Sequence, residues 1–283
     1  MVERTIRFGE HPAVPVIGQG TWYMGENPAL RAQEAAALRA GIDLGLTVID
    51  TAEMYADGGA EEVVGEAIRG QRDRVVLVSK VYPWNAGGRK IARACEASLR
   101  RLNTDYLDLY LLHWRGDYSL QETVAGMEAL VAQGKIRRWG VSNLDEDDMQ
   151  QLWQVEGGER CATNQVLYHL ASRGIEYDLL PWCQQRRPVM AYCPLAQAGR
   201  LRNGLLNHTV VKNIAQERGV TAAQILLAWV ISRREVLAIP KASSIEHVAQ
   251  NAAALDIVLN DEELALLDKA YPAPARKTPL DMV

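Results

Sequence analysis

The chain has 283 residues, which is enough for two ordinary domains or one large barrel, and its formal net charge is −4. This charge gives no sign of a nucleic-acid or membrane-surface partner, and no apolar stretch approaches the roughly 20 residues of a membrane span. The first residues lack the apolar region of a signal peptide, and Cys95, Cys161, Cys183 and Cys193 form neither a CxxC pair nor a disulfide framework, so we expect a cytoplasmic protein with reduced thiols.

Apolar runs typical of buried strands alternate with helical patterns along the chain. The first helix is expected to begin at Asn27-Pro28, with proline at the first helical position, and to end at Gly45. Further helices are expected at residues 61–69, 89–102, 120–133, 146–154, 177–185, 209–218, 222–232 and 245–255. The strands are expected at residues 14–20, 47–50, 75–80, 107–113, 136–142, a short run ending at 164–165, 188–192 and 236–240.

Eight such units of about 30 residues predict a closed (β/α)8 barrel that spans residues 1–283 as a single domain. Residues 5–10 fall outside this cycle, and we expect them to form half of a small hairpin that covers the barrel floor. An open dinucleotide-binding sheet would show G-x-G-x-x-G after its first strand, but Gly18 and Gly20 are followed by no third glycine at that spacing. Any nucleotide must therefore be held in another way.

Three successive strands each end in one reactive polar side chain: Asp50, Lys80 and His113. The carboxyl ends of parallel barrel strands meet at one mouth, so these groups and the nearby Tyr55 are expected to lie together. A buried lysine needs a carboxylate, so Lys80 should pair with Asp50, and its charge should lower the pKa of the Tyr55 phenol. Such a tyrosine can protonate a carbonyl oxygen that His113 orients, while a reduced cofactor supplies the hydride.

Each of these groups also has a structural interpretation. An Asp–Lys pair can be only a satisfied ion pair, a loop tyrosine can be structural, and a histidine after an apolar run can be a core residue. Their coincidence on three successive strands favours chemistry.

The later strands end in polar groups of another kind. Ser142, Asn143 and Gln165 can bind a carboxamide through paired donors and acceptors, and the ring of Tyr192 can stack on a flat heterocycle. This combination suits nicotinamide, although a strand-end serine or asparagine can also be a simple helix cap.

A possible phosphate site follows the last strand. Lys241, Ser243 and Ser244 precede a helix N-terminus, and a lysine beside such a terminus is a ready anion site. A plain helix cap would give the same pattern.

With these motifs in order, the chain resembles the aldo-keto reductases over nearly its whole length. The segments that carry the resemblance are residues 41–55, 111–114, 127–143, 164–169 and 239–241. The resemblance implies a (β/α)8 barrel without a Rossmann domain and an extended NADPH. By motif position, it places the family's catalytic tetrad on Asp50, Tyr55, Lys80 and His113, its carboxamide grip on Ser142, Asn143 and Gln165, and its ring-stacking tyrosine on Tyr192.

The expected cofactor residues follow the whole mouth of the barrel. Two positions depart from the family pattern: His247 stands where many relatives carry an arginine that clamps the 2′-phosphate, and Ala242 stands where a hydroxyl is common. We therefore expect NADPH and keep NADH open. The full expected set is Gly20, Thr21, Trp22, Asp50, Ser142, Asn143, Gln165, Tyr192, Pro194, Leu195, Gln197, Lys241, Ser243, Ser244, His247 and Asn251.

A narrower likeness links the chain to a short bacterial group that reduces methylglyoxal and related 2-oxoaldehydes. Residues 22–24, 82–84 and the tail 271–283 carry it. The short tail implies an open pocket for small polar carbonyls, with core packing as the alternative role for the tryptophans. The expected substrate residues are Trp22, Trp84, His113 and Trp114.

Three arginines near the mouth each have two possible interpretations, one functional and one structural. Arg115 follows Trp114 where proline is usual, and it could attract anionic substrates or be a solvated charge. Arg200 and Arg202 could cover the cofactor pyrophosphate or face solvent.

The sequence thus predicts a cytoplasmic monomer that reduces small aldehydes and ketones with NADPH, uses no metal, and binds neither nucleic acid nor membrane. One alternative is a cofactor-sensing regulatory subunit with secondary reductase activity, and the lack of an added interaction segment at either end counts against it. Another is a metal-dependent barrel hydrolase built on Asp50 and His113, and the missing HxH or carboxylate cluster counts against that.

Overall fold

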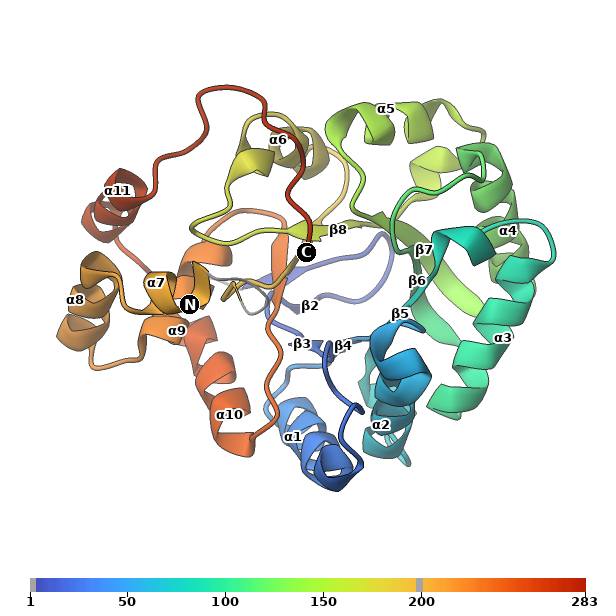
Figure 1. Cartoon of the computed structure of the whole chain (residues 1–283), viewed down its shortest axis with the longest axis horizontal. Helices are drawn as coiled ribbons and strands as arrows, with labels where there is room; N and C mark the ends of the chain where they lie inside the picture. Colours follow the sequence, from blue (N-terminus) through green and yellow to red (C-terminus); the bar gives the residue numbers. More distant parts are fainter. Residues whose placement is uncertain (1–3, 197–200) are drawn as a thin grey trace.

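Eight parallel strands surrounded by helices make up the fold (Figure 1). The computed structural model describes residues 4–196 and 201–283, without the side chains of residues 201–203. The strand order is β10-β9-β8-β7-β6-β5-β4-β3, so each strand pairs with the next one along the chain. The strands are β3 (Gln19–Gly20), β4 (Val48–Asp50), β5 (Val76–Val81), β6 (Leu107–Leu112), β7 (Ile136–Ser142), β8 (Asn164–Leu167), β9 (Val189–Tyr192) and β10 (Val236–Ile239).

The sheet closes where the last strand meets the first. The Gly18 N–H donates to the Ala238 carbonyl at 2.8 Å, and the Gly20 N–H donates to the Pro240 carbonyl at 3.0 Å. In the other direction, the Ala238 N–H donates to the Val16 carbonyl at 2.9 Å. Closure pairs both edges of the sheet, which confirms the predicted (β/α)8 barrel.

Helices follow the strands and form the outer layer of the barrel. The nine predicted helices are present, and apart from the start of the first their bounds agree within about two residues, the usual uncertainty of a helix end. Two helices, α7 and α11, were not predicted. The helices are α1 (Arg31–Asp43), α2 (Gly59–Ala67), α3 (Lys90–Leu102), α4 (Leu120–Ala132), α5 (Glu146–Gln154), α6 (Leu179–Gln184), α7 (Leu201–Leu206), α8 (Thr209–Arg218), α9 (Ala222–Val230), α10 (Ile245–Ala253) and α11 (Asp261–Ala270).

Two strand predictions need correction. The predicted first strand at 14–20 divides in two, because β2 (Val14–Pro15) pairs antiparallel with β1 (Thr5–Ile6) and only β3 joins the barrel. The sixth strand was expected to end at Gln165, but β8 begins at Asn164, since the apolar pair that follows continues the ladder with β9.

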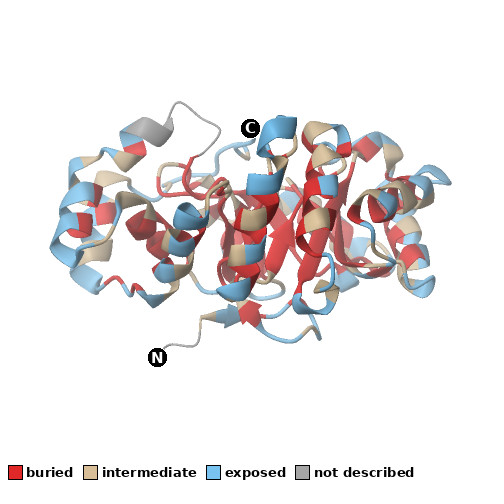
Figure 2. Cartoon of the chain, turned by 90° about the horizontal axis from the view of Figure 1, so that it is seen from below, coloured by how far each residue is buried: buried red, intermediate tan, exposed pale blue. Residues whose placement is uncertain are grey.

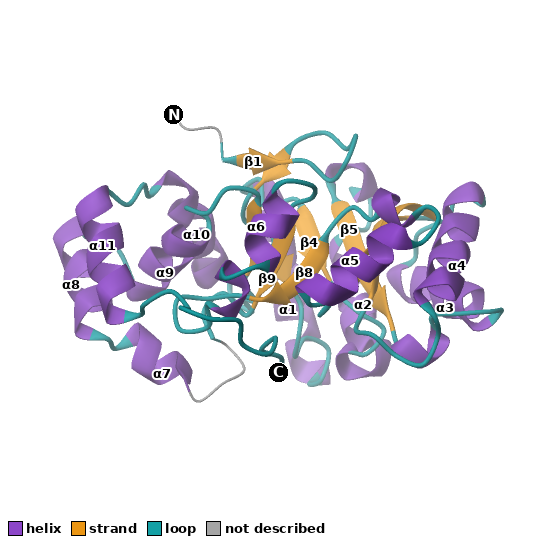
Figure 3. Ribbon diagram, turned by 90° about the horizontal axis from the view of Figure 1, so that it is seen from above, coloured by secondary structure: helices purple, strands orange, loops and turns teal. Residues whose placement is uncertain are grey.

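The hairpin of β1 and β2 covers one end of the barrel, as predicted for residues 5–10. Figures 2 and 3 show it on the face opposite to the last residues of the chain. Phe8, in the connection between its strands, is almost completely buried. The hairpin end is the barrel floor, and the carboxyl ends of the strands form the mouth.

The strands are buried on both faces, because helices cover the sheet and side chains fill the barrel. Every residue of β5 and β6 is buried, which explains why these strands are almost continuous apolar runs. A polar side chain in such a strand must find its partners inside the protein. Within the described residues, no helix is long and apolar enough to cross a membrane.

The closure of the barrel predicts a steric effect at Gly20. A Cβ at this position would lie 2.6 Å from the carbonyl oxygen of Ile239 and would push β3 away from the segment after β10. We expect Gly20→Ala to lower the free energy of unfolding by about 1–3 kcal/mol. Urea denaturation measures this, with Gly204→Ala as the control, because a Cβ on Gly204 in α7 meets no described atom within 4 Å. Equal stability of the Gly20 variant and the parent would contradict the closure argument.

Candidate active site

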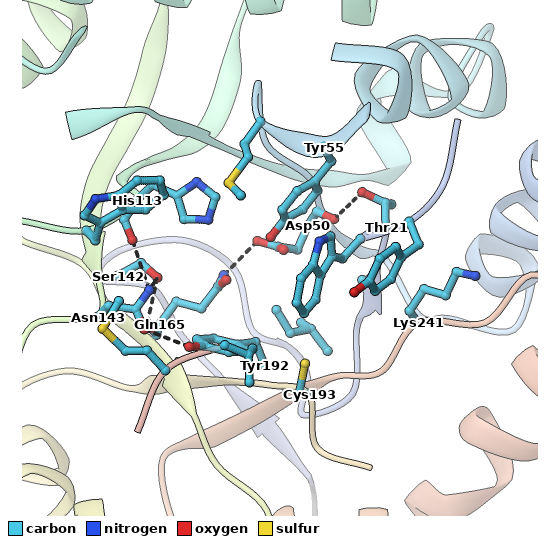
Figure 4. Close-up of a pocket in the computed structure, with 18 residues that line it drawn as sticks. Thr21, Asp50, Tyr55, His113, Ser142, Asn143, Gln165, Tyr192, Cys193 and Lys241 are labelled. Carbon is cyan, nitrogen blue, oxygen red and sulfur yellow. Dashed lines mark hydrogen bonds between the residues drawn. The ribbon is translucent and has the colours of Figure 1, made fainter. Parts of the chain in front are cut away.

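A cavity of about 190 Å3 opens at the mouth of the barrel (Figure 4). It brings together residues that the sequence places on seven of the eight barrel strands or directly after them. Twelve predicted site residues line it: Gly20, Thr21, Trp22, Asp50, Tyr55, His113, Trp114, Ser142, Asn143, Gln165, Tyr192 and Lys241.

Lys80, on β5, lies fully buried behind this cavity. Its Nζ donates to Asp50 Oδ2 at 2.7 Å, to the Thr51 carbonyl at 2.8 Å and to the Tyr55 hydroxyl at 3.1 Å. All three donor positions of the ammonium group are therefore used. The predicted pairing of Lys80 with Asp50 is present, and it brings the amine to the phenol.

Asp50, the partner of Lys80, accepts further hydrogen bonds through its carboxylate and through its backbone carbonyl. Its Oδ1 accepts from Gln165 Nε2 at 2.7 Å, and its backbone carbonyl accepts from the Thr21 hydroxyl at 2.9 Å (Figure 4). Burial raises the pKa of Asp50 and lowers that of Lys80, and the charge of each partner opposes the shift of the other. The ion pair depends on these hydrogen bonds because neither charge reaches water.

The pKa of the Tyr55 phenol lies well above its usual value, which corrects the expectation that Lys80 lowers it. Burial is the largest cause, and the negative charge of Asp50 adds to it. Asp50 lies against the lysine and offsets much of its field at the phenol. Tyr55 therefore keeps its proton at neutral pH and can release it only to a strong base, such as a forming alkoxide.

His113 follows β6 and is also buried. Burial, with the charge of Lys80, keeps its pKa well below the usual value, so the imidazole is neutral at pH 7. Its ring lies edge-on to the Tyr55 ring, with centroids 5.8 Å apart. The buried Nδ1 atom has no hydrogen-bond partner among the described residues. A neutral imidazole in this place can donate one hydrogen bond to a carbonyl oxygen without carrying charge.

The amide side of the cavity is a connected hydrogen-bond network. Asn143 Nδ2 donates to the His113 carbonyl at 3.1 Å and to Ser142 Oγ at 3.2 Å, and Asn143 Oδ1 accepts from the Tyr192 hydroxyl at 2.8 Å (Figure 4). The Ser142 hydroxyl donates to the Gln165 carbonyl at 2.8 Å. Asn143 adopts a φ of 57°, a strained conformation that asparagine tolerates and that often marks functional sites.

Aromatic side chains form another wall. Trp22 stacks on Tyr23 with ring centroids 4.7 Å apart, and Trp114 lines the cavity beside His113. Trp84, predicted as a substrate residue, does not line the cavity. It stacks on Tyr82 at 4.3 Å and remains 54% exposed, so it supports Trp114 from outside.

The predicted phosphate residues divide between the cavity and its surroundings. Lys241 lines the cavity, whereas the other expected residues do not. Ser244 Oγ accepts from the His247 N–H at 3.3 Å and caps α10, which is the structural alternative for this segment, and the His247 side chain is exposed. Pro194 and Leu195 are buried beside the cavity, and Asn251 is buried within α10. Ser243 is partly buried, and its backbone carbonyl accepts a hydrogen bond from the Gln33 side chain.

The arginines near the mouth are only partly described. Arg115 binds Asp148 and the Gln151 side chain on α5, so its charge is paired on the barrel exterior. Gln197 and Arg200 lie outside the described residues, and so does the side chain of Arg202.

Six residues of the cavity were not predicted: Tyr23, Met54, Cys193, Ile239, Met282 and Val283. The first four stand next to predicted residues or at a strand end, so their places along the chain would have indicated them. The last two come from the tail, where no local pattern points to the mouth. Within residues 4–196 and 201–283, no group of three or more potential metal-binding side chains is present.

The buried ion pair predicts a specific stability change. Lys80→Met leaves Asp50 buried without its cation, and we expect a loss of about 3–5 kcal/mol in the free energy of unfolding at pH 7. Because burial already raises the pKa of Asp50, the loss should grow as pH rises above about 4, the value of an unfolded carboxyl. Urea titrations at pH 4, 5.5 and 7 test this.

A double-variant cycle supplies the control. Asp50→Asn combined with Lys80→Met removes both charges, so it should recover part of the stability that Lys80→Met loses. Additive losses, or a loss in Lys80→Met that does not vary with pH, would contradict the ion-pair argument.

Comparison with known proteins places the chain in a family. The model of the Aldo/keto reductase family matches residues 16–272. The chain is 70% identical to methylglyoxal reductase YeaE of Escherichia coli (strain K12), over the full length of both proteins, and 33% identical to glyoxal reductase of Bacillus subtilis (strain 168), over 82% of this chain and 81% of that one. The crystal structure of an aldo/keto reductase from Klebsiella pneumoniae in complex with NADP and acetate superposes with a TM-score of 0.98, at 76% identity and complete coverage of both chains. The chain belongs to the aldo/keto reductase family.

Proposed function

We propose that the protein reduces small aldehydes and ketones with NADPH, and that 2-oxoaldehydes such as methylglyoxal are its substrates. The observation that carries this proposal is the contact of one buried ammonium group, Lys80 Nζ, with both Asp50 and the Tyr55 hydroxyl at the edge of the cavity. The names of the Escherichia coli and Bacillus subtilis relatives support the substrate class.

The residues of the cavity fit a nicotinamide. The network of Ser142, Asn143 and Gln165 presents amide and hydroxyl groups that match a carboxamide, and the Tyr192 ring beside it can stack on a flat heterocycle. When bound, the reduced nicotinamide supplies the hydride. The Klebsiella pneumoniae relative was crystallised with NADP, which supports the choice of cofactor.

The protein's own groups handle the proton and the carbonyl. His113, neutral at pH 7, donates a hydrogen bond that orients the carbonyl oxygen. As hydride reaches the carbonyl carbon, the oxygen becomes basic enough to take the proton of Tyr55, and the product is an alcohol. Lys80 then stabilises the phenolate by its 3.1 Å contact, and Asp50 holds Lys80 in place.

The remaining expectations belong to the same proposal. We propose one domain that acts as a monomer in the cytoplasm, with no nucleic acid or membrane as partner. The four cysteines are free and buried, which suits a reducing compartment.

The mechanism predicts the effect of removing the proton donor. Tyr55→Phe should lower kcat for methylglyoxal reduction by about 10²–10⁴-fold, while NADPH binding stays within about two-fold of the parent. Stopped-flow and steady-state kinetics, with cofactor fluorescence for binding, measure both. Tyr82→Phe is the matched control, because Tyr82 lies outside the cavity, and it should keep the parent rate. Turnover by Tyr55→Phe at the parent rate would show that another group donates the proton.

Cofactor choice provides an independent measurement. We expect kcat/KM to be higher with NADPH than with NADH, because Lys241 lines the cavity and offers a cation to the 2′-phosphate. Lys241→Met should reduce the preference for NADPH by about ten-fold or more, because one charge-assisted hydrogen bond contributes about 1.5–3 kcal/mol. A strong preference for NADH in the parent protein would mean that the exposed His247 has changed the specificity.

A further inference from the structure

The tail of the chain returns to the mouth of the barrel after α11. Figures 1 and 3 show it running from α11 past α6 toward the carboxyl ends of the strands. Met282 and Val283 line the same cavity as Tyr55 and His113. The tail therefore contributes to the site, although the chemistry of reduction assigns it no role.

Lys277 is one of the residues that join this tail to the barrel. Lys277 Nζ lies 3.2 Å from Asp178 Oδ2, 3.3 Å from Asp147 Oδ2 and 3.7 Å from Asp145 Oδ2. Asp145 and Asp178 also cap helices, since they accept from the N–H groups of Glu146 and Leu179, both at 2.7 Å. Two of the three carboxylates are thus fixed at helix starts on the barrel, and Lys277 joins the tail to them.

Further contacts lie on both sides of Lys277. The Ser172 hydroxyl donates to Asp281 Oδ2 at 2.6 Å, and Leu280 packs against the core. Near the root of the tail, Arg173 donates to the Tyr271 carbonyl. These contacts fix the direction in which the last residues approach the cavity.

The end of the tail reaches the hydrogen-bond network of the amide side, because Val283 and Tyr192 line the same cavity. Burial raises the pKa of Tyr192, and the nearby backbone of Val283 opposes that rise. The Tyr192 hydroxyl donates to Asn143 Oδ1 at 2.8 Å, and Asn143 Nδ2 donates to the His113 carbonyl at 3.1 Å. The tail end therefore lies beside Tyr192, and two hydrogen bonds lead from Tyr192 through Asn143 to the backbone of His113.

We propose that Lys277 is a positioning residue, which seats the tail end against Tyr192 so that tail docking and nicotinamide binding stabilise each other. The proposal rests on the proposed function only for the identity of the cofactor. Binding linkage is reciprocal, so the factor by which a bound cofactor favours the docked tail equals the factor by which the docked tail favours cofactor binding. A variant that undocks the tail must therefore weaken cofactor binding.

Hydrogen exchange of the full-length protein tests the docking directly, without turnover. In Lys277→Met, amide exchange in residues 280–283 should rise by about five-fold or more, and in the parent, saturating NADPH should slow exchange in the same segment by about five-fold or more. Lys277→Arg keeps the charge and should behave like the parent. Unchanged tail exchange in Lys277→Met, or no response of the parent tail to NADPH, would overturn the proposal.

Cofactor binding and kinetics test the linkage. By fluorescence titration, Lys277→Met should raise the Kd of NADPH by about five-fold, and it should raise KM for methylglyoxal while kcat stays within about two-fold. Lys135→Met is the matched control, because Lys135 directly precedes β7 at the barrel floor and pairs with Glu96 on α3, and the Kd and KM of this variant should equal those of the parent. The proposal fails if both variants change equally, or if the Kd of NADPH in Lys277→Met equals that of the parent.

Failure of the proposed function gives a different result. A parent protein that binds NADPH but reduces no carbonyl contradicts the function, while tail exchange and NADPH affinity still decide the role of Lys277. A parent protein that binds no nicotinamide cofactor overturns both proposals, because the linkage then has no ligand.

Discussion

The contact between Lys80 and Asp50 is the interaction on which the mouth of this barrel depends. Two opposite charges without access to water are expensive to bury unless every remaining hydrogen-bonding position is satisfied. Thr51 and Tyr55 follow Asp50 closely along the chain and reach Lys80 where β4 pairs with β5, whereas Gln165 comes from β8. The full set meets only when the barrel has formed, so the fold completes the site.

This constraint also sets the proton states of the groups that face the cavity. A pair of charges in close contact has a weak field at a distance, so burial decides the pKa of the neighbours. Tyr55 keeps its proton and His113 stays neutral, and both groups are hydrogen-bond donors at pH 7. The site is therefore prepared to receive the negative charge that develops on a carbonyl oxygen.

Most of the fold could be predicted from the sequence, because strands buried on both faces read as apolar runs and make a polar residue such as Lys80 conspicuous. The helix α11 was missed although Asn260 and Glu263 form a capping box, a signal present in the sequence. The place of Met282 in the cavity could not be predicted, because it depends on a lysine meeting carboxylates far away along the chain. The direction of the pKa shift of Tyr55 could not be predicted either, because it results from a balance between burial and opposite charges.

The hairpin at the floor and the tail at the mouth give the two ends of the described chain different surroundings. Figures 2 and 3 show them on opposite faces of the barrel. A peptide label or fusion partner attached ahead of β1 extends from the closed end, far from the cavity. The same label attached after Val283 begins inside the rim of the cavity, where it disturbs the contact between Val283 and Tyr192. The position of a purification tag is therefore a variable in any comparison of rates between preparations of this enzyme.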